Sequence, residues 1–117
     1  MQSRPFLDDM LAYARKALTL VGERDGAALA SDEVRFLAVQ RCIEIIGEAA
    51  SRTPSPVADA LSHIEFRNAA ATRHRIVHGY RTIDPDIVAR TVSDHFPKLV
   101  ADLEVALAGQ LPDESQE

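Results

Sequence analysis

The sequence predicts an all-α fold, an up-and-down four-helix bundle with one short extra helical turn. Three long segments repeat apolar residues at three- and four-residue spacing, a fourth contains no Pro or Gly, and no alternating strand pattern of useful length appears. Hydrophobic residues make up 46% of the 117 positions and aromatic residues only 5%, a composition that suits closely packed helices. This length supports one core, so a single domain is expected over residues 1–110, followed by an acidic flexible tail at 111–117.

The first helix is predicted over residues 5–24. Pro5 suits a first helical turn because its φ is already fixed near the helical value. The apolar residues that follow keep helical spacing: Leu7, Met10, Leu11, Ala14, Ala17, Leu18 and Val21. Asp25 and Gly26 form a turn signal that ends this helix.

The second helix is predicted from Ser31, whose hydroxyl can cap it, to about residue 51. The acidic pair after Ser31 suits the positive end of the helix dipole. The apolar stripe consists of Val34, Leu37, Ala38, Cys42, Ile45, Ile46 and Ala49. The prolines of TPSP at 53–56 end the helix, and a short helical turn is expected at 57–61.

The third helix is predicted from His63 to about His78, because this segment lacks Pro and Gly and stops at Gly79, a natural cap. A fourth helix follows from Asp84, the next cap, to about residue 109. Its apolar face consists of Ile87, Val88, Val92, Phe96, Leu99, Val100, Leu103, Val105 and Leu107. Pro97 lies inside this helix and is expected to kink it or to divide it.

Composition narrows the class of protein. The net charge of -5 argues against non-specific nucleic-acid binding by the whole surface. The single cysteine, Cys42, cannot form an internal disulfide, and its place on an apolar stripe favours core packing over a nucleophilic role. No apolar run approaches the ~18 residues of a membrane span, and the start MQSRPFLDD lacks the apolar core of a secretory signal. A cytoplasmic protein without membrane partners is expected.

One segment is positively charged, in contrast to the acidic chain as a whole. Between Phe66 and Ile83 there is no Asp or Glu, whereas six cationic or imidazole side chains lie there: Arg67, Arg73, His74, Arg75, His78 and Arg81. Most of them fall in TRHRIVHGY at 72–80, at the end of the third helix. An anion-attracting patch on an otherwise acidic body is therefore expected.

Arginine beside histidine suits phosphodiester chemistry. A guanidinium binds phosphate oxygens through two hydrogen bonds, and an imidazole exchanges protons near neutral pH. RNA carries its own nucleophile, because a deprotonated ribose 2′-hydroxyl can attack the adjacent phosphate without a metal, whereas DNA lacks that hydroxyl. On one helix, Arg73 and His78 are separated by about 140° and about 7.5 Å of rise. A two-fold axis beside the helix would bring such pairs from two chains together.

Other interpretations fit the same residues. Spacing alone also fits a solvated helix end whose cations complement the helix dipole. Arg67 and His74 form a second Arg/His pair on one stripe. His74 and His78 have zinc-ligand spacing, but the glutamate of an HExxH motif is missing, so no metal and no cofactor are predicted. His63 and His95 are expected at the surface.

The run FRNAAATRHRIVHGYRTIDPDIVARTV resembles the signature region of the HEPN superfamily, specifically its HepT-like toxin branch. The motif positions here are Phe66, Arg73, His74, His78 and Tyr80. The resemblance extends upstream to IEIIGEAA at 43–50 and downstream to DHFPKL, and it covers about residues 5–108.

This resemblance implies a homodimer through the third helix, with a composite metal-independent ribonuclease site at the interface. Arg73 and His78 are the implied catalytic residues, and His74 stands where the toxin branch usually has asparagine. The implied partner is an MntA-like nucleotidyltransferase antitoxin, which transfers AMP to the motif tyrosine, here Tyr80. The adduct would block RNA by its charge and volume.

Four further residues complete the expected site. Glu48, in the IGEA segment, either faces solvent or approaches the motif arginine across the bundle, and Arg67 is a second auxiliary residue. Arg75 and Arg81 are expected to contact RNA. The alternative function is a non-catalytic HEPN module that binds a nucleotide or a nucleotidyltransferase, in which the patch serves binding only.

Overall fold

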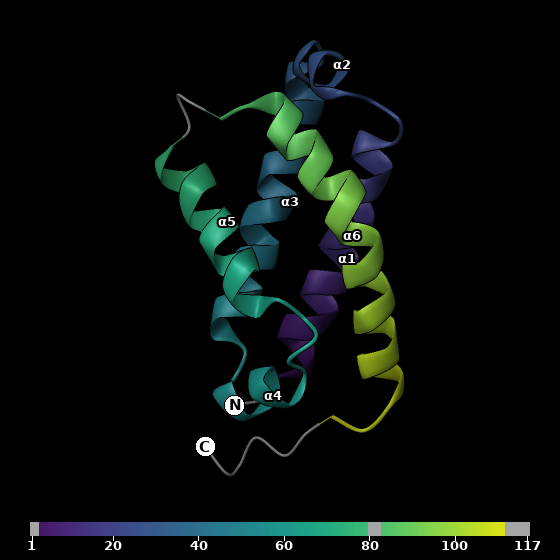
Figure 1. The fold of residues 1–117 in the computed structure, drawn as a ribbon, viewed down its shortest axis with the longest axis vertical. Helices are drawn as coiled ribbons and strands as arrows, with labels where there is room; N and C mark the ends of the chain where they lie inside the picture. The colour runs from purple at the N-terminus through teal and green to yellow at the C-terminus, as the bar shows by residue number, and fades with distance from the viewer. Residues whose placement is uncertain (1–2, 80–82, 112–117) are drawn as a thin grey trace.

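The computed structural model describes residues 3–79 and 83–111, except for the side chains of Val77 and His78. These residues form helices and no strand, so the predicted all-α fold is confirmed. Figure 1 shows the six helices, which are α1 (Arg4–Val21), α2 (Gly26–Ala30), α3 (Glu33–Arg52), α4 (Ser55–Ala60), α5 (Phe66–His78) and α6 (Pro85–Ala108). Within the described ranges, no helix is both long and apolar enough to cross a membrane.

Helix α3 lies at the centre of the bundle. It packs against α1 on one side and α5 on the other, α6 packs against α1, and short α2 contacts both α3 and α6 (Figure 1). The large side chains that are fully buried come from α1, α2, α3, α4 and α6, and they include Leu7, Met10, Leu29, Ile46, Val57 and Leu103. Because α5 packs against α3, its position depends on that one helix face.

Two helix boundaries in the N-terminal half differ from the predicted ones. Helix α1 ends at Val21 because Gly22 adopts a positive φ of 55°, which favours glycine. The predicted turn at Asp25 and Gly26 instead starts α2, because the Asp25 carboxylate accepts a hydrogen bond of 2.9 Å from the Ala28 N–H. The turn prediction was therefore wrong, since a capping aspartate followed by glycine also begins a helix.

The cap of α3 also differs from the prediction. Asp32, not Ser31, caps the helix, because its Oδ1 accepts a hydrogen bond of 3.1 Å from the Arg35 N–H. Its Oδ2 lies 3.1 Å from Arg35 Nε, so one arginine holds both oxygens. The hydrogen bond from the Arg35 backbone, followed by that from its side chain, lowers the pKa of the Asp32 carboxyl.

The C-terminal half follows the predicted order of helices, with shifted boundaries. Helix α5 begins at Phe66, three residues later than expected, and its predicted cap is confirmed because the Gly79 N–H donates to the Arg75 carbonyl at 2.8 Å. Helix α6 continues through Pro97, so of the two alternatives, a kink or a division, the division does not occur. Four residues assigned to apolar faces are largely exposed: Val34 (79%), Leu37 (56%), Ile87 (54%) and Val105 (74%).

Candidate functional site

Helix α5, which carries the cationic segment, separates two hollows. On one side lies a hollow of about 480 Å³ between α1, α3 and α5, named here the α3 hollow. On the other side lies an open cleft of about 1010 Å³ between α5 and α6, named here the α5–α6 cleft. Arg73 lines the α3 hollow, whereas His74 and Arg75 line the α5–α6 cleft.

Close packing of α3 against α5 fixes the start of the Arg73 side chain. Gly47 is buried in α3, and a methyl group at this position would overlap Cβ of Arg73 and lie 2.7 Å from the Ala69 carbonyl oxygen. The absence of a side chain at Gly47 therefore lets the two backbones approach each other. Arg73 begins against α3, and its guanidinium reaches along that helix to Glu48.

Glu48 holds two guanidiniums at once. Its Oε2 lies 3.3 Å from Arg73 Nε, and its Oε1 accepts a hydrogen bond of 2.7 Å from Arg52 Nε. The Arg52 hydrogen bond lowers the pKa of the Glu48 carboxyl, and the charge of Arg73 acts in the same direction. Both arginines use Nε here, so their terminal amino groups retain donors for an anion. Of the two expectations for Glu48, the structure places it next to the motif arginine.

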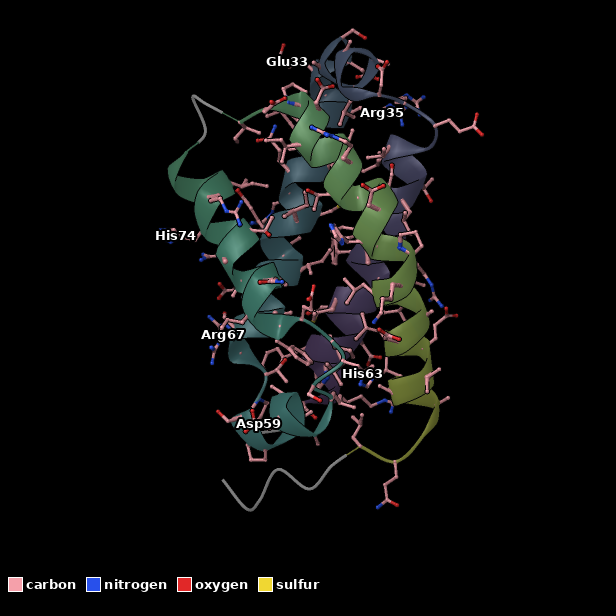
Figure 2. All side chains as sticks on the ribbon, in the orientation of Figure 1. Glu33, Arg35, Asp59, His63, Arg67 and His74 are labelled. Carbon is pink, nitrogen blue, oxygen red and sulfur yellow. The ribbon has the colours of Figure 1, made fainter. Side chains whose placement is uncertain are left out.

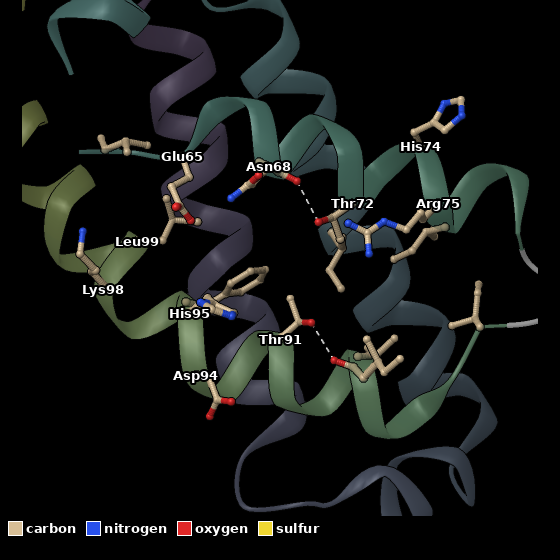
Figure 3. Close-up of a pocket in the computed structure, with 18 of the residues that line it drawn as sticks. Glu65, Asn68, Thr72, His74, Arg75, Thr91, Asp94, His95, Lys98 and Leu99 are labelled. Atoms are coloured by element: carbon tan, nitrogen blue, oxygen red, sulfur yellow. Dashed lines mark hydrogen bonds between the residues drawn. The ribbon is translucent and has the colours of Figure 1, made fainter. Parts of the chain in front are cut away.

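The other predicted residues that the structure describes lie on other sides of α5. Arg67 and His74 are exposed, and Figure 2 shows both side chains at the outer surface of α5. Neither residue lines the α3 hollow with Arg73. Figure 3 shows Arg75 on the cleft side of the helix. His78 is the last residue of α5, with its side chain outside the described part. Tyr80 and Arg81 lie outside the described residues.

The α5–α6 cleft combines an apolar floor with polar walls. The floor includes Ile43, Ile76, Phe96 and Leu99. Two wall hydroxyls bond within their own helices, Thr72 to the Asn68 carbonyl at 2.8 Å and Thr91 to the Ile87 carbonyl at 2.7 Å (Figure 3). His63 and His95 are exposed, as predicted, and both line this cleft. The cleft therefore offers mostly apolar contact surface.

The sequence did not predict the roles of Gly47, Arg41 and Arg52 around the Arg73–Glu48 pair. In the sequence, nothing except its small size indicates the role of Gly47. Arg41 has the features of an ordinary surface arginine. Arg52 follows Glu48 by four residues, a spacing that indicates an ion pair on one helix face. The spacing could have identified that pair, but not its connection to Arg73.

Cys42 is buried, as predicted, and burial raises the pKa of its thiol. A buried neutral thiol packs as a small apolar group and is a poor nucleophile. Over residues 3–79 and 83–111, no three His, Cys, Asp or Glu side chains gather in a way that could hold a metal ion.

The relatives and the family model that match this chain all carry ribonuclease names. "Putative RNase MJ0125" of Methanocaldococcus jannaschii is 29% identical, over 86% of this chain and 93% of its own. "Probable ribonuclease HepT" of Thermococcus cleftensis is 32% identical, over 58% of this chain and 62% of its own. No solved structure matches. The family model described as Ribonuclease HepT-like matches residues 10–106, which confirms the resemblance seen in the sequence. The chain belongs to the HepT-like ribonuclease family.

Proposed function

We propose that this protein is a metal-independent endoribonuclease, the toxin of a toxin-antitoxin pair. The observation that carries the proposal is the Arg73 guanidinium, which Glu48 holds at the edge of an open hollow on the helix that ends in His78. Arg73 binds the scissile phosphate and stabilises the charge that develops on it. Membership of a ribonuclease family supports RNA as the substrate.

The reaction needs one base and one acid. His78 removes the proton from a ribose 2′-hydroxyl, and the oxygen attacks the neighbouring phosphorus as the bond to the 5′-oxygen breaks. The products are a 2′,3′-cyclic phosphate and a 5′-hydroxyl, whose proton comes from a second imidazole or from water. In a dimer, the second chain supplies another His78.

The α5–α6 cleft supports self-association as the way to complete the site. Ile76, Ile83 and Leu99 line it, and Ile87 at its edge is 54% exposed. A two-fold contact between two such surfaces would bury this apolar area and bring both copies of α5 together. Transfer of AMP to Tyr80 by a nucleotidyltransferase partner would then place a bulky anion two residues after His78 and exclude RNA.

The decisive experiment measures cleavage of a labelled RNA by purified protein in EDTA. We expect wild type to cleave RNA and to leave intact the same strand carrying 2′-O-methyl groups, and we expect His78→Ala to be inactive. Full cleavage by His78→Ala would contradict the assigned mechanism. RNA binding without any cleavage by wild type would favour the non-catalytic binding module. Intact-mass measurement after incubation with ATP and the partner tests the expected AMP addition, with Tyr80→Phe as control.

A further inference from the structure

The α3 hollow brings three arginines together over an apolar floor. Arg41 and Arg52 come from α3 and Arg73 from α5, while Phe6 of α1 and Ile45 of α3 supply nonpolar surface. Its volume of about 480 Å³ lies within the ~300–1,000 Å³ range of small-ligand sites. A group bound there would lie next to the proposed catalytic arginine.

The ion pairs in the hollow can be exchanged for a phosphate. Arg41 pairs with Glu44 at 3.1 Å, and Glu48 pairs with both Arg52 and Arg73. The side chains of Arg41, Arg52 and Arg73 are 69%, 61% and 38% exposed, and ion pairs so open to solvent are weak. A phosphodiester accepts two hydrogen bonds from each guanidinium, which makes it a competitive partner.

The arrangement around Glu48 selects one position for that phosphate. Asp9 and Glu44 also line the hollow, so its formal charges balance as a whole. Two guanidiniums share the one carboxylate of Glu48, however, which leaves a local excess of one positive charge. One phosphodiester would neutralise it. The hollow is therefore suited to a single phosphate with an attached base, and not to a long stretch of backbone.

We propose that the α3 hollow is a subsite for one nucleotide of the RNA, adjacent to the bond that is cleaved. Arg52 joins Arg73 on the scissile phosphate, and Phe6 with Ile45 contacts the base next to it. This assignment rests on the proposed ribonuclease function, which it extends to a neighbouring nucleotide. Because every base presents an apolar face to an aromatic ring, the subsite tolerates any base.

The test measures binding of a fully 2′-O-methylated RNA strand, which resists cleavage by 2′-hydroxyl attack, at several salt concentrations. Arg52→Gln should weaken binding about tenfold. It should also reduce the slope of log K against log salt by about 0.7, the value for one phosphate contact on a single strand. Phe6→Leu should weaken binding severalfold without changing the slope, because it removes stacking but no charge. Circular dichroism checks that both variants are folded.

Arg15→Gln is the matched control. Arg15 is 53% exposed and pairs with Glu104 at 2.9 Å, so it resembles Arg52 in exposure and pairing but lies outside the hollow. Its removal should leave both affinity and slope unchanged. An equal loss in Arg15→Gln and Arg52→Gln would mean diffuse attraction and would overturn the subsite.

Failure of the subsite and failure of the ribonuclease proposal give different results. If wild type cleaves RNA while Arg52→Gln binds with unchanged affinity and slope, the subsite is overturned and the ribonuclease stands. If wild type never cleaves RNA but Arg52→Gln still reduces the slope of log K against log salt, the hollow binds RNA in a non-catalytic protein. If Arg52→Gln weakens only association with a protein partner, the hollow is a docking site and the nucleotide assignment is wrong.

Discussion

Replacing Gly47 with alanine should move the arginine of the site. The added methyl would overlap Cβ of Arg73 and lie 2.7 Å from the Ala69 carbonyl oxygen. Neither obstacle is the free end of a flexible side chain, so α3 and α5 must part by roughly 1 Å to restore ordinary contact distances. Overpacking costs about 1–3 kcal/mol, whereas the better helix propensity of alanine returns up to about 1 kcal/mol. The expected net loss in unfolding free energy is about 1–2 kcal/mol.

Urea unfolding followed by circular dichroism measures this loss as a lower midpoint at unchanged m-value. Cleavage by the folded variant should fall by up to about 100-fold, because a shift of ~1 Å in a positioning group has effects of that size. Gly109→Ala is the control, since the nearest atom to its added methyl is the Val105 carbonyl oxygen at 3.8 Å. A Gly47→Ala protein at least as stable as wild type would refute the close contact between α3 and α5.

Three other side chains give separate predictions. Asp32→Ala should lower the free energy of unfolding, measured in urea, by about 1 kcal/mol because it removes the α3 cap. A larger decrease in Ser31→Ala would contradict the assignment of Asp32 as the cap. The Arg52 hydrogen bond lowers the pKa of Glu48 from 4.5, so its carboxylate stabilises the fold above that pH and the contribution disappears as pH falls through the folded pKa. The unfolding free energies of wild type and Glu48→Gln should therefore converge as pH falls from 4.5 through the lowered folded pKa, and a difference that stays constant as pH falls would refute the linkage. Burial raises the pKa of the Cys42 thiol above 9.0, so a thiol reagent at pH 8 should label it slowly in the native protein and rapidly in urea. Equal rates in both conditions would show that the thiol is accessible.

Periodicity was sufficient to predict α1, α3 and α6, because each buries an apolar stripe over several turns, whereas α5 was predicted from the absence of Pro and Gly and from its Gly79 cap. These signals were not sufficient for α2, whose five residues are too few to show a period. At the start of α3, Ser31 and Asp32 are both good caps. Asp32 takes the role because Arg35 binds both of its carboxylate oxygens, a contact that neither residue type reveals alone.

Exposure was harder to predict than helix formation. Val34 and Leu37 continue the apolar stripe of α3, yet both are exposed in the N-terminal part of that helix. A stripe shows which face is apolar, but it does not show how far the neighbouring helices extend over it. The same limit applies to the site, since a sequence cannot reveal that Gly47 faces Arg73 or that Arg52 and Arg73 share one carboxylate.

The two hollows lie on different sides of α5. We therefore expect that mutations can separate nucleotide binding from self-association. Arg73 and Arg75 differ by about 200° around the helix axis, and they line different hollows. The α3 hollow is built from one chain, whereas the proposed composite site needs two. Ile87→Asp places a charge on a residue that is 54% exposed at the cleft edge, so the fold should survive.

If a second copy covers the α5–α6 cleft, Ile87→Asp should be monomeric by light scattering at micromolar concentration, because a buried carboxylate without a partner is costly. Its RNA cleavage should be lost, since each catalytic pair then lacks its counterpart. Binding of 2′-O-methyl RNA should remain, with a salt slope that still falls by about 0.7 when Arg52→Gln is added. A dimeric and active Ile87→Asp protein would place the self-association surface elsewhere, and the α5–α6 cleft would then need another role.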